Sequence, residues 1–130
     1  MANKWIQLMN SGGTDNLFPT TNMDLLWTNA SPTSNFDGQT VSIDLSDYKL
    51  VYINCSLANT SSDGSTTALI KIGDYGNLFH GFVGTGSGYY VACRRAYVTT
   101  TGVTFTVGRA CTTNTTNNSI CIPYQIYGIK

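Results

Sequence analysis

The feature that most constrains this chain is the two-residue alternation of apolar side chains after residue 40. In TVSIDLS (40–46), Val41, Ile43 and Leu45 share one face, and polar residues take the other. A period of two is the period of a half-buried β-strand. Further segments that we predict as strands lie at 50–57, 67–74, 78–83, 89–100, 103–112 and 119–130.

Turn-forming residues separate these segments, which is typical of an all-β domain. We predict an antiparallel β-sandwich of seven or eight strands, jelly-roll-like, over residues 40–130. GTGSG (84–88) is predicted as a turn, because it lacks the helix and lysine of a phosphate-binding loop. Residues 1–39 are rich in Asn, Gly and Pro. They are predicted as an extended N-terminal arm with one or two short strands, one of them at 4–9.

The charge composition narrows the set of partners. Charged residues make up 11% of the chain, and the formal net charge is zero. Arg94, Arg95 and Arg109 are the only arginines, too few for the basic stripe of a nucleic-acid-binding protein. The N-terminus lacks the apolar core of a signal peptide, and no segment approaches the roughly 18 apolar residues of a membrane span. We therefore expect no nucleic acid, no membrane and a reducing cytosol.

The four cysteines allow three interpretations. Cys111 and Cys121 flank a polar run centred near Thr116, so we predict a hairpin in which they are cross-strand neighbours. Cys55 and Cys93 fall within apolar alternation and are predicted as small core residues. We favour reduced, packed cysteines because of the compartment. A Cys111–Cys121 disulfide is the next interpretation, and a metal site, for which further ligands are lacking, is the last.

The sequence contains no motif that requires catalysis. His80 is the only histidine and lies in the apolar stretch LFHGF, so we predict a structural role. Asp44 with Asp47, or Asp63 with Asp74, could serve as the carboxyl pair of a glycosidase. Asp is also common in turns, which explains most of these positions without catalysis. We expect no enzyme, no cofactor and no metal.

The aromatic residues are candidates for contacts with partners. Phe105 and Tyr124 fit core positions. Tyr89 and Tyr90 are consecutive, so one of them points away from the core of a strand. Tyr127 is out of step with the core positions of its segment. Exposed tyrosines beside polar residues suit a sugar site, and they equally suit a subunit interface, which we favour. The candidate ligand or subunit contacts are Tyr89, Tyr90, Tyr127 and Asp63.

Four segments carry a resemblance to a known group of proteins. They are KWIQLMNSGGTDNLFPTT, SDYKLVYINCS, RRAYVTTTGVTF and CIPYQIYGIK. Together they resemble small virion proteins of bacteriophages and prophages of Gram-positive bacteria, which are described as tail-fibre, head-fibre or receptor-binding modules. The resemblance implies a β-sandwich that assembles as a trimer. A tail fibre has a long N-terminal shaft, whereas this chain has only the arm, which favours a compact accessory module.

These inferences combine into one expectation and two alternatives. We expect a non-enzymatic structural protein of the virion surface: a capsid decoration, head-fibre or fibre-tip module, made in the bacterial host cytoplasm. Its expected partners are two further copies of itself, in a homotrimer, and other virion proteins. The first alternative is a carbohydrate-binding module that recognises a host cell-surface glycan. The remote alternative is a polysaccharide hydrolase.

Overall fold

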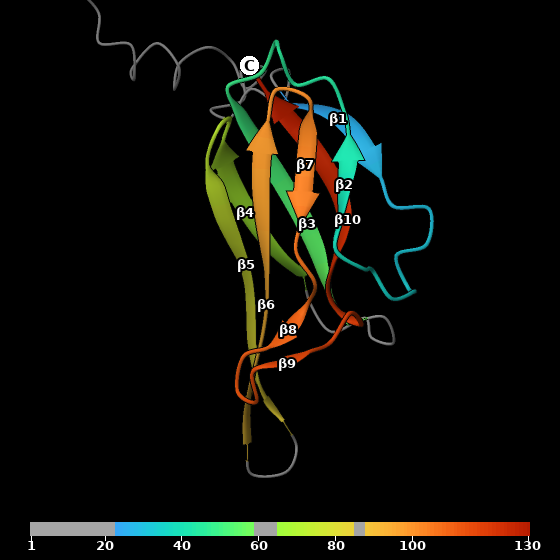
Figure 1. Ribbon diagram of the computed structural model, residues 1–130, viewed down its shortest axis with the longest axis vertical. Coiled ribbons are helices and arrows are strands. Elements are labelled where there is room, and N and C mark those ends of the chain that lie inside the picture. Colours follow the sequence, from blue (N-terminus) through green and yellow to red (C-terminus); the bar gives the residue numbers. More distant parts are fainter. Residues whose placement is uncertain (1–22, 59–64, 85–87) are drawn as a thin grey trace, which may run out of the picture.

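The computed structural model describes residues 23–58, 65–84 and 88–130 (Figure 1). Within these residues the chain forms ten β-strands and no helix. The strands are β1 (Met23–Thr28), β2 (Gln39–Ser42), β3 (Leu50–Ala58), β4 (Ser65–Lys71), β5 (Tyr75–Gly84), β6 (Gly88–Thr99), β7 (Gly102–Phe105), β8 (Arg109–Ala110), β9 (Thr115–Thr116) and β10 (Ile120–Ile129). The predicted all-β class is confirmed. The structure has more strands than the seven or eight predicted, for two reasons. The predicted strand at 103–112 divides into β7 and β8, and the predicted turn after it contains the two-residue strand β9.

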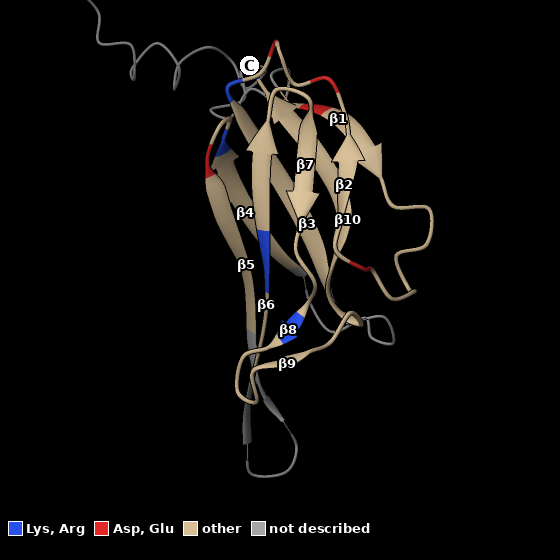
Figure 2. Ribbon diagram, in the orientation of Figure 1, with Lys and Arg blue, Asp and Glu red and all other residues tan. Residues whose placement is uncertain are grey.

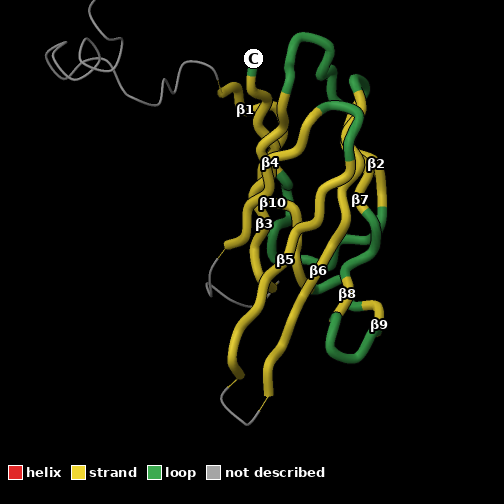
Figure 3. The backbone as a smooth tube through the Cα atoms, turned by 90° about the vertical axis from the view of Figure 1, so that its left-hand side faces the viewer, coloured by secondary structure: helices red, strands yellow, loops and turns green. Residues whose placement is uncertain are grey.

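The strands form two antiparallel sheets that pack as the layers of a sandwich (Figure 3). The four-stranded sheet has the order β1-β10-β3-β4. In the six-stranded sheet, β6 pairs with β5 along one edge and with both β7 and β8 along the other. β2 pairs with the far edge of β7, and β9 pairs with the far edge of β8. The hairpin of β5 and β6 extends past the other strands (Figures 1 and 3).

The core lies between the sheets and follows the predicted alternation. In β3, Val51, Ile53 and Cys55 are fully buried, and the residues between them are half-buried. The predicted core position of Phe105 is confirmed, because only 1% of it is exposed. The main buried cluster consists of Phe36, Val41, Leu45, Val51, Ile53, Cys55, Ile70, Leu78, Ala96, Val98, Val103, Phe105, Ile122 and Ile126.

The described part of the predicted arm packs on the sandwich. β1 is an edge strand of the four-stranded sheet, paired with β10. Phe36 is buried, and its ring meets those of Trp27 and Phe105 edge-on, at centroid distances of 6.3 Å and 5.6 Å. These contacts explain why residues without clear alternation are nevertheless ordered on the domain. The predicted strand at 4–9 lies outside the described residues.

The last strand departs from regular alternation at two points. Cys121 has a φ of 46°, in the left-handed region that side chains rarely adopt. Tyr124 is the extra residue of a β-bulge between Pro123 and Gln125. Each irregularity disturbs the alternation of inward and outward side chains along β10, and Tyr124 is 37% exposed as a result. The predicted core position of Tyr124 is therefore wrong.

Candidate functional site

Arg94 is a charged residue at an inward-facing position of the six-stranded sheet. It lies in β6 in phase with Ala92, Ala96 and Val98, and only 1% of it is exposed. A guanidinium carries five N–H donors, and leaving donors unsatisfied in a protein interior is costly. The structure must therefore supply several acceptors at this point of the core.

The acceptors of Arg94 are main-chain carbonyl oxygens from three separate segments. Its Nε donates to Cys121 at 2.8 Å, its Nη2 to Phe36 at 2.9 Å and to Ile120 at 3.3 Å, and its Nη1 to Thr106. The guanidinium also lies 5.2 Å from the centroid of the Phe36 ring. Arg94 thus ties the segment before β2, the segment after β7 and the beginning of β10 to β6.

Two backbone features adapt this region to the arginine. A Cβ added to Gly108 would lie 2.9 Å from Nη2 of Arg94 and would collide with the carbonyl oxygen of Asn117. Cys121 has a left-handed backbone conformation, and its carbonyl oxygen accepts a hydrogen bond from Nε of Arg94. Burial lowers the pKa of Arg94, yet arginine remains charged in proteins. The core therefore holds a positive charge.

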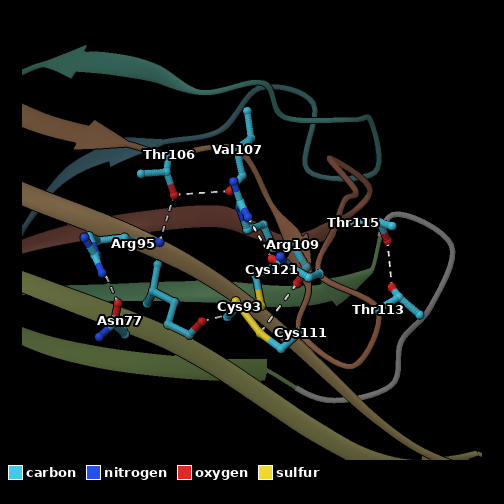
Figure 4. Close-up of a disulfide and its surroundings, with 12 residues drawn as sticks. Asn77, Cys93, Arg95, Thr106, Val107, Arg109, Cys111, Thr113, Thr115 and Cys121 are labelled. Carbon is cyan, nitrogen blue, oxygen red and sulfur yellow. Dashed lines mark hydrogen bonds between the residues drawn. A yellow bond between two sulfur atoms is a disulfide. The ribbon is translucent and has the colours of Figure 1, made fainter.

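A disulfide between Cys93 and Cys111 connects β6 to the residue that follows β8 (Figure 4). Cys121 is a free, buried cysteine. The proposed Cys111–Cys121 disulfide and the assignment of Cys93 to the core are therefore both wrong. The predicted hairpin is also wrong, because the turn is shorter: Arg109 pairs with Thr116 across β8 and β9.

The favoured prediction of reduced packing cysteines is wrong for Cys93 and Cys111 and agrees with the free Cys55 and Cys121. Cys55 and Cys121 are both fully buried. Burial raises the pKa of the Cys121 thiol to about 11, and it raises the pKa of Cys55 further. Both remain thiols at neutral pH and are poor nucleophiles.

The outer face of the six-stranded sheet carries a concavity that we call the arginine pocket. It has a volume of about 480 Å³ and is lined by Asn77, Phe79, Cys93, Arg94, Arg95, Thr106, Val107 and Arg109. The sheet register explains this set, because Asn77 faces Arg95 and Phe79 faces Cys93 across β5 and β6. Cys93 in turn faces Arg109 across β6 and β8. Figure 4 labels six of the lining residues near the disulfide, namely Asn77, Cys93, Arg95, Thr106, Val107 and Arg109.

The apolar outer surface of the four-stranded sheet is a second candidate site. We call it the apolar face and define it as Met23, Leu25, Leu50, Tyr52, Leu69, Tyr127 and Ile129. Leu25, Tyr127, Tyr52 and Leu69 are successive neighbours across all four strands. Leu69 is 60% exposed, Leu25 is 52% exposed and Met23 is 39% exposed.

Two polar atoms beside the apolar face lack partners. Asn54 and Ser56 occupy outward positions of β3, next to Tyr52 in the alternation. Their side-chain oxygens are shielded from water and accept or donate no hydrogen bond among the described residues. Such groups are rare in proteins, and a bound water or a partner often satisfies them.

Only some of the residues predicted as contacts lie in the part of the chain that the structure describes. Tyr127 is half-buried on the apolar face, where its ring meets that of Tyr52 at 5.9 Å. The backbone of Tyr89 and Tyr90 lies in β6, but their side chains lie outside the described part. Asp63 lies entirely outside it. The structure thus offers Tyr127 for a contact and leaves the other three predictions as they were.

The catalytic candidates gain no support from the described residues. His80 is half-buried in β5. Asp44 accepts hydrogen bonds from Ser46, which lower the pKa of the carboxyl group and fix a local turn. In the described ranges, no cluster of three or more His, Cys, Asp or Glu side chains could hold a metal ion. The same ranges contain no helix long and apolar enough to cross a membrane.

Sequence reasoning missed the arginine pocket, although a signal was present. Arg94 falls in phase with Ala92 and Ala96 in a segment predicted as a strand, which places a charge at an inward position. Arg95 must then point outward. The position of Arg109 next to Cys93 depends on long-range pairing, for which the sequence holds no local signal.

Comparison with protein families, with curated proteins and with solved structures found no match for this chain.

Proposed function

We propose that this protein is a non-enzymatic structural component of a phage virion surface, working as a homotrimer in a capsid decoration, head fibre or fibre tip. The observation that supports this proposal best is the apolar face. An exposed apolar patch on a soluble domain is a common mark of an interaction site. The resemblance of the sequence to small virion proteins supplies the setting, and trimers are the assembly that it implies.

The composition of the apolar face suits contact between copies of the chain. Tyr, Met, Leu and Ile form it, while the one charged neighbour in its rows, Lys71, lies on the edge strand β4. Interface centres are enriched in aromatic residues and Met and depleted of Lys and Asp. The unpartnered oxygens of Asn54 and Ser56 beside the face would gain partners or waters in an assembly. The net charge of zero is also better tolerated in an assembly than in a free monomer.

Two measurements test this proposal. Native mass spectrometry and light scattering of the purified chain at micromolar concentration should give a trimer. Antibody labelling of intact particles should place the chain on their surface. A stable monomer that is also absent from purified particles would refute the proposal.

A carbohydrate-binding module is the second candidate, and the arginine pocket favours it. Its exposed Phe79, Asn77 amide and Thr106 hydroxyl are the groups that recognise sugars, namely an apolar surface with a few polar groups. For the hydrolase alternative, a pair of carboxyl groups is needed. No carboxylate lines the described pocket, so it offers that alternative no support.

A further inference from the structure

The arginine pocket has a charge that differs from that of the whole chain. The formal net charge of the protein is zero, yet the exposed Arg95 and Arg109 line this pocket, the buried Arg94 borders it, and no carboxylate lines it. Figure 2 shows blue segments and no red ones on β6 and β8. Asp37 stabilises the charge of Arg94 but is not a lining residue. The pocket is therefore a local positive site in a neutral protein.

The two exposed arginines of the pocket are held by neutral groups. Nε of Arg95 lies 3.5 Å from Oδ1 of Asn77, at the limit for a hydrogen bond. Nη1 of Arg109 donates to Oδ1 of Asn114 at 2.9 Å. Among the described residues, neither arginine forms an ion pair with a carboxylate. Both retain donors for a ligand, since each guanidinium carries five.

The register makes these two arginines diagonal neighbours on one face of the sheet. Arg109 faces Cys93, and Arg95 lies two residues from Cys93 on the same side of β6. Such diagonal neighbours in an antiparallel pair have Cα atoms about 7–8 Å apart, within reach of long side chains. The Cys93–Cys111 disulfide fixes β8 against β6. Each of the two planar guanidinium groups suits bidentate binding of a carboxylate or phosphate.

The other lining groups restrict the ligand further. Phe79 is 55% exposed and offers an apolar ring to a sugar face, and Asn77 offers an amide to sugar hydroxyl groups. The Thr106 hydroxyl donates to the carbonyl of Val107 and accepts from the N–H of Arg95, so it offers a ligand one remaining acceptor site. The volume of about 480 Å³ falls within the usual range of ligand pockets. We propose that the arginine pocket binds an anionic saccharide, in which a carboxylate or phosphate group lies between Arg95 and Arg109 and a sugar ring lies against Phe79.

This proposal goes beyond a role in the virion and does not depend on it, because binding is measured on the purified chain. The probes are oligogalacturonate, which carries carboxylates, glucose 6-phosphate, which carries a phosphate, neutral dextran oligomers and a DNA duplex. Binding is measured by calorimetry and by amide chemical shifts at low and physiological salt. We expect one of the first two probes to bind, with shifts centred on Asn77, Arg95 and Arg109.

The variant Arg95→Gln/Arg109→Gln should lower the affinity at least tenfold, because both charged contacts are lost. Lys71→Gln, which removes an exposed charge from the opposite sheet, is the matched control and should bind like the unchanged chain. The unfolding midpoint of each variant shows that it is folded. Equal binding of dextran, tighter binding of DNA, no binding of either anionic saccharide, or unchanged binding by the double variant would each overturn the proposal.

Discussion

The two sheets of this sandwich have similar inner faces and different outer faces. Inward positions in both sheets are filled mainly by Val, Ile, Leu and Ala. On the four-stranded sheet, outward positions form the apolar face, where Leu25 to Leu69 make an unbroken row across four strands. On the six-stranded sheet they form the arginine pocket. The same two-residue alternation generates both surfaces, so it tells which residues point outward but not what they bind.

The difference indicates that the outer faces of the two sheets have different roles. An exposed apolar row is a liability for a monomer, while it stabilises an assembly that covers it. The N–H groups of Arg95 and Arg109 can bind a ligand only if the arginine pocket stays open to solvent. We therefore expect the four-stranded sheet to face other protein subunits and the six-stranded sheet to face outward.

The largest expected effect comes from Arg94, which supports the arginine pocket from within the core. Arg94→Met should lower the free energy of unfolding by at least about 3 kcal/mol, because three buried carbonyl oxygens and one partly buried carbonyl oxygen lose their donor. Arg94→Lys should lose less, since an ammonium still offers three donors. Urea unfolding measures both. Arg95→Met, an exposed neighbour, is the control and should change stability by less than about 0.5 kcal/mol. Equal stability of the Arg94 and Arg95 variants would contradict the structural role given to Arg94.

The next effect should come from the disulfide beside the pocket. Cys93→Ser/Cys111→Ser should lower the free energy of unfolding by about 3 kcal/mol, because the bond closes a loop with a sequence separation of 18 residues. A reducing agent should lower the unfolding midpoint of the unchanged chain to that of the double variant. It should leave the double variant itself unaffected. If the reducing agent has no effect on the unchanged chain, the Cys93–Cys111 bond does not form in solution.

A matched pair of substitutions compares the two outer faces directly. Leu69 and Phe79 are both exposed apolar residues, at 60% and 55%, on opposite sheets. Leu69→Asp should raise the dissociation constant of the oligomer at least tenfold, equivalent to about 1.4 kcal/mol, because it introduces a charge into the apolar face. Phe79→Asp should leave the oligomer intact and weaken saccharide binding. Analytical ultracentrifugation measures the first effect. The reverse result would exchange the roles of the two faces.

Much of this fold is predictable from the sequence, because alternation reports burial strand by strand. The inward positions of β3, from Val51 to Cys55, are one example. The predictions failed where geometry depends on partners distant in sequence. The bulge that exposes Tyr124 arises from pairing between β10 and β3, and the bond from Cys93 to Cys111 arises from pairing between β6 and β8. Neither pairing has a local signal. The pocket was missed for the same reason, since its residues come from four segments that only the sheet brings together.

The smallest expected effect concerns the edge strand β1, which carries Met23 and Leu25 of the apolar face. The carboxylate of Asp24 accepts a hydrogen bond from the Tyr48 hydroxyl at 2.8 Å and forms an ion pair with Nζ of Lys130 at 2.9 Å. The hydrogen bond from Lys130, followed by that from Tyr48, lowers the pKa of Asp24 below 3.8, and Asp24 raises the pKa of Lys130 above 10.5. The contribution of Asp24 to stability is therefore fully present above pH 3.8 and is lost as the pH falls through its folded-state pKa. The contribution of Lys130 is present below pH 10.5 and is lost at higher pH.

Asp24→Asn should therefore lower the unfolding midpoint slightly at neutral pH, and the difference from the unchanged chain should vanish under strongly acidic conditions. Tyr48→Phe should show part of the effect, because it removes one of the two groups that donate to Asp24. High salt should reduce the difference, since exposed charges are screened. Thermal unfolding as a function of pH measures it. A difference that persists at a pH where both carboxyl and amide are neutral would show that Asp24 acts through packing of β1 and not through its charge.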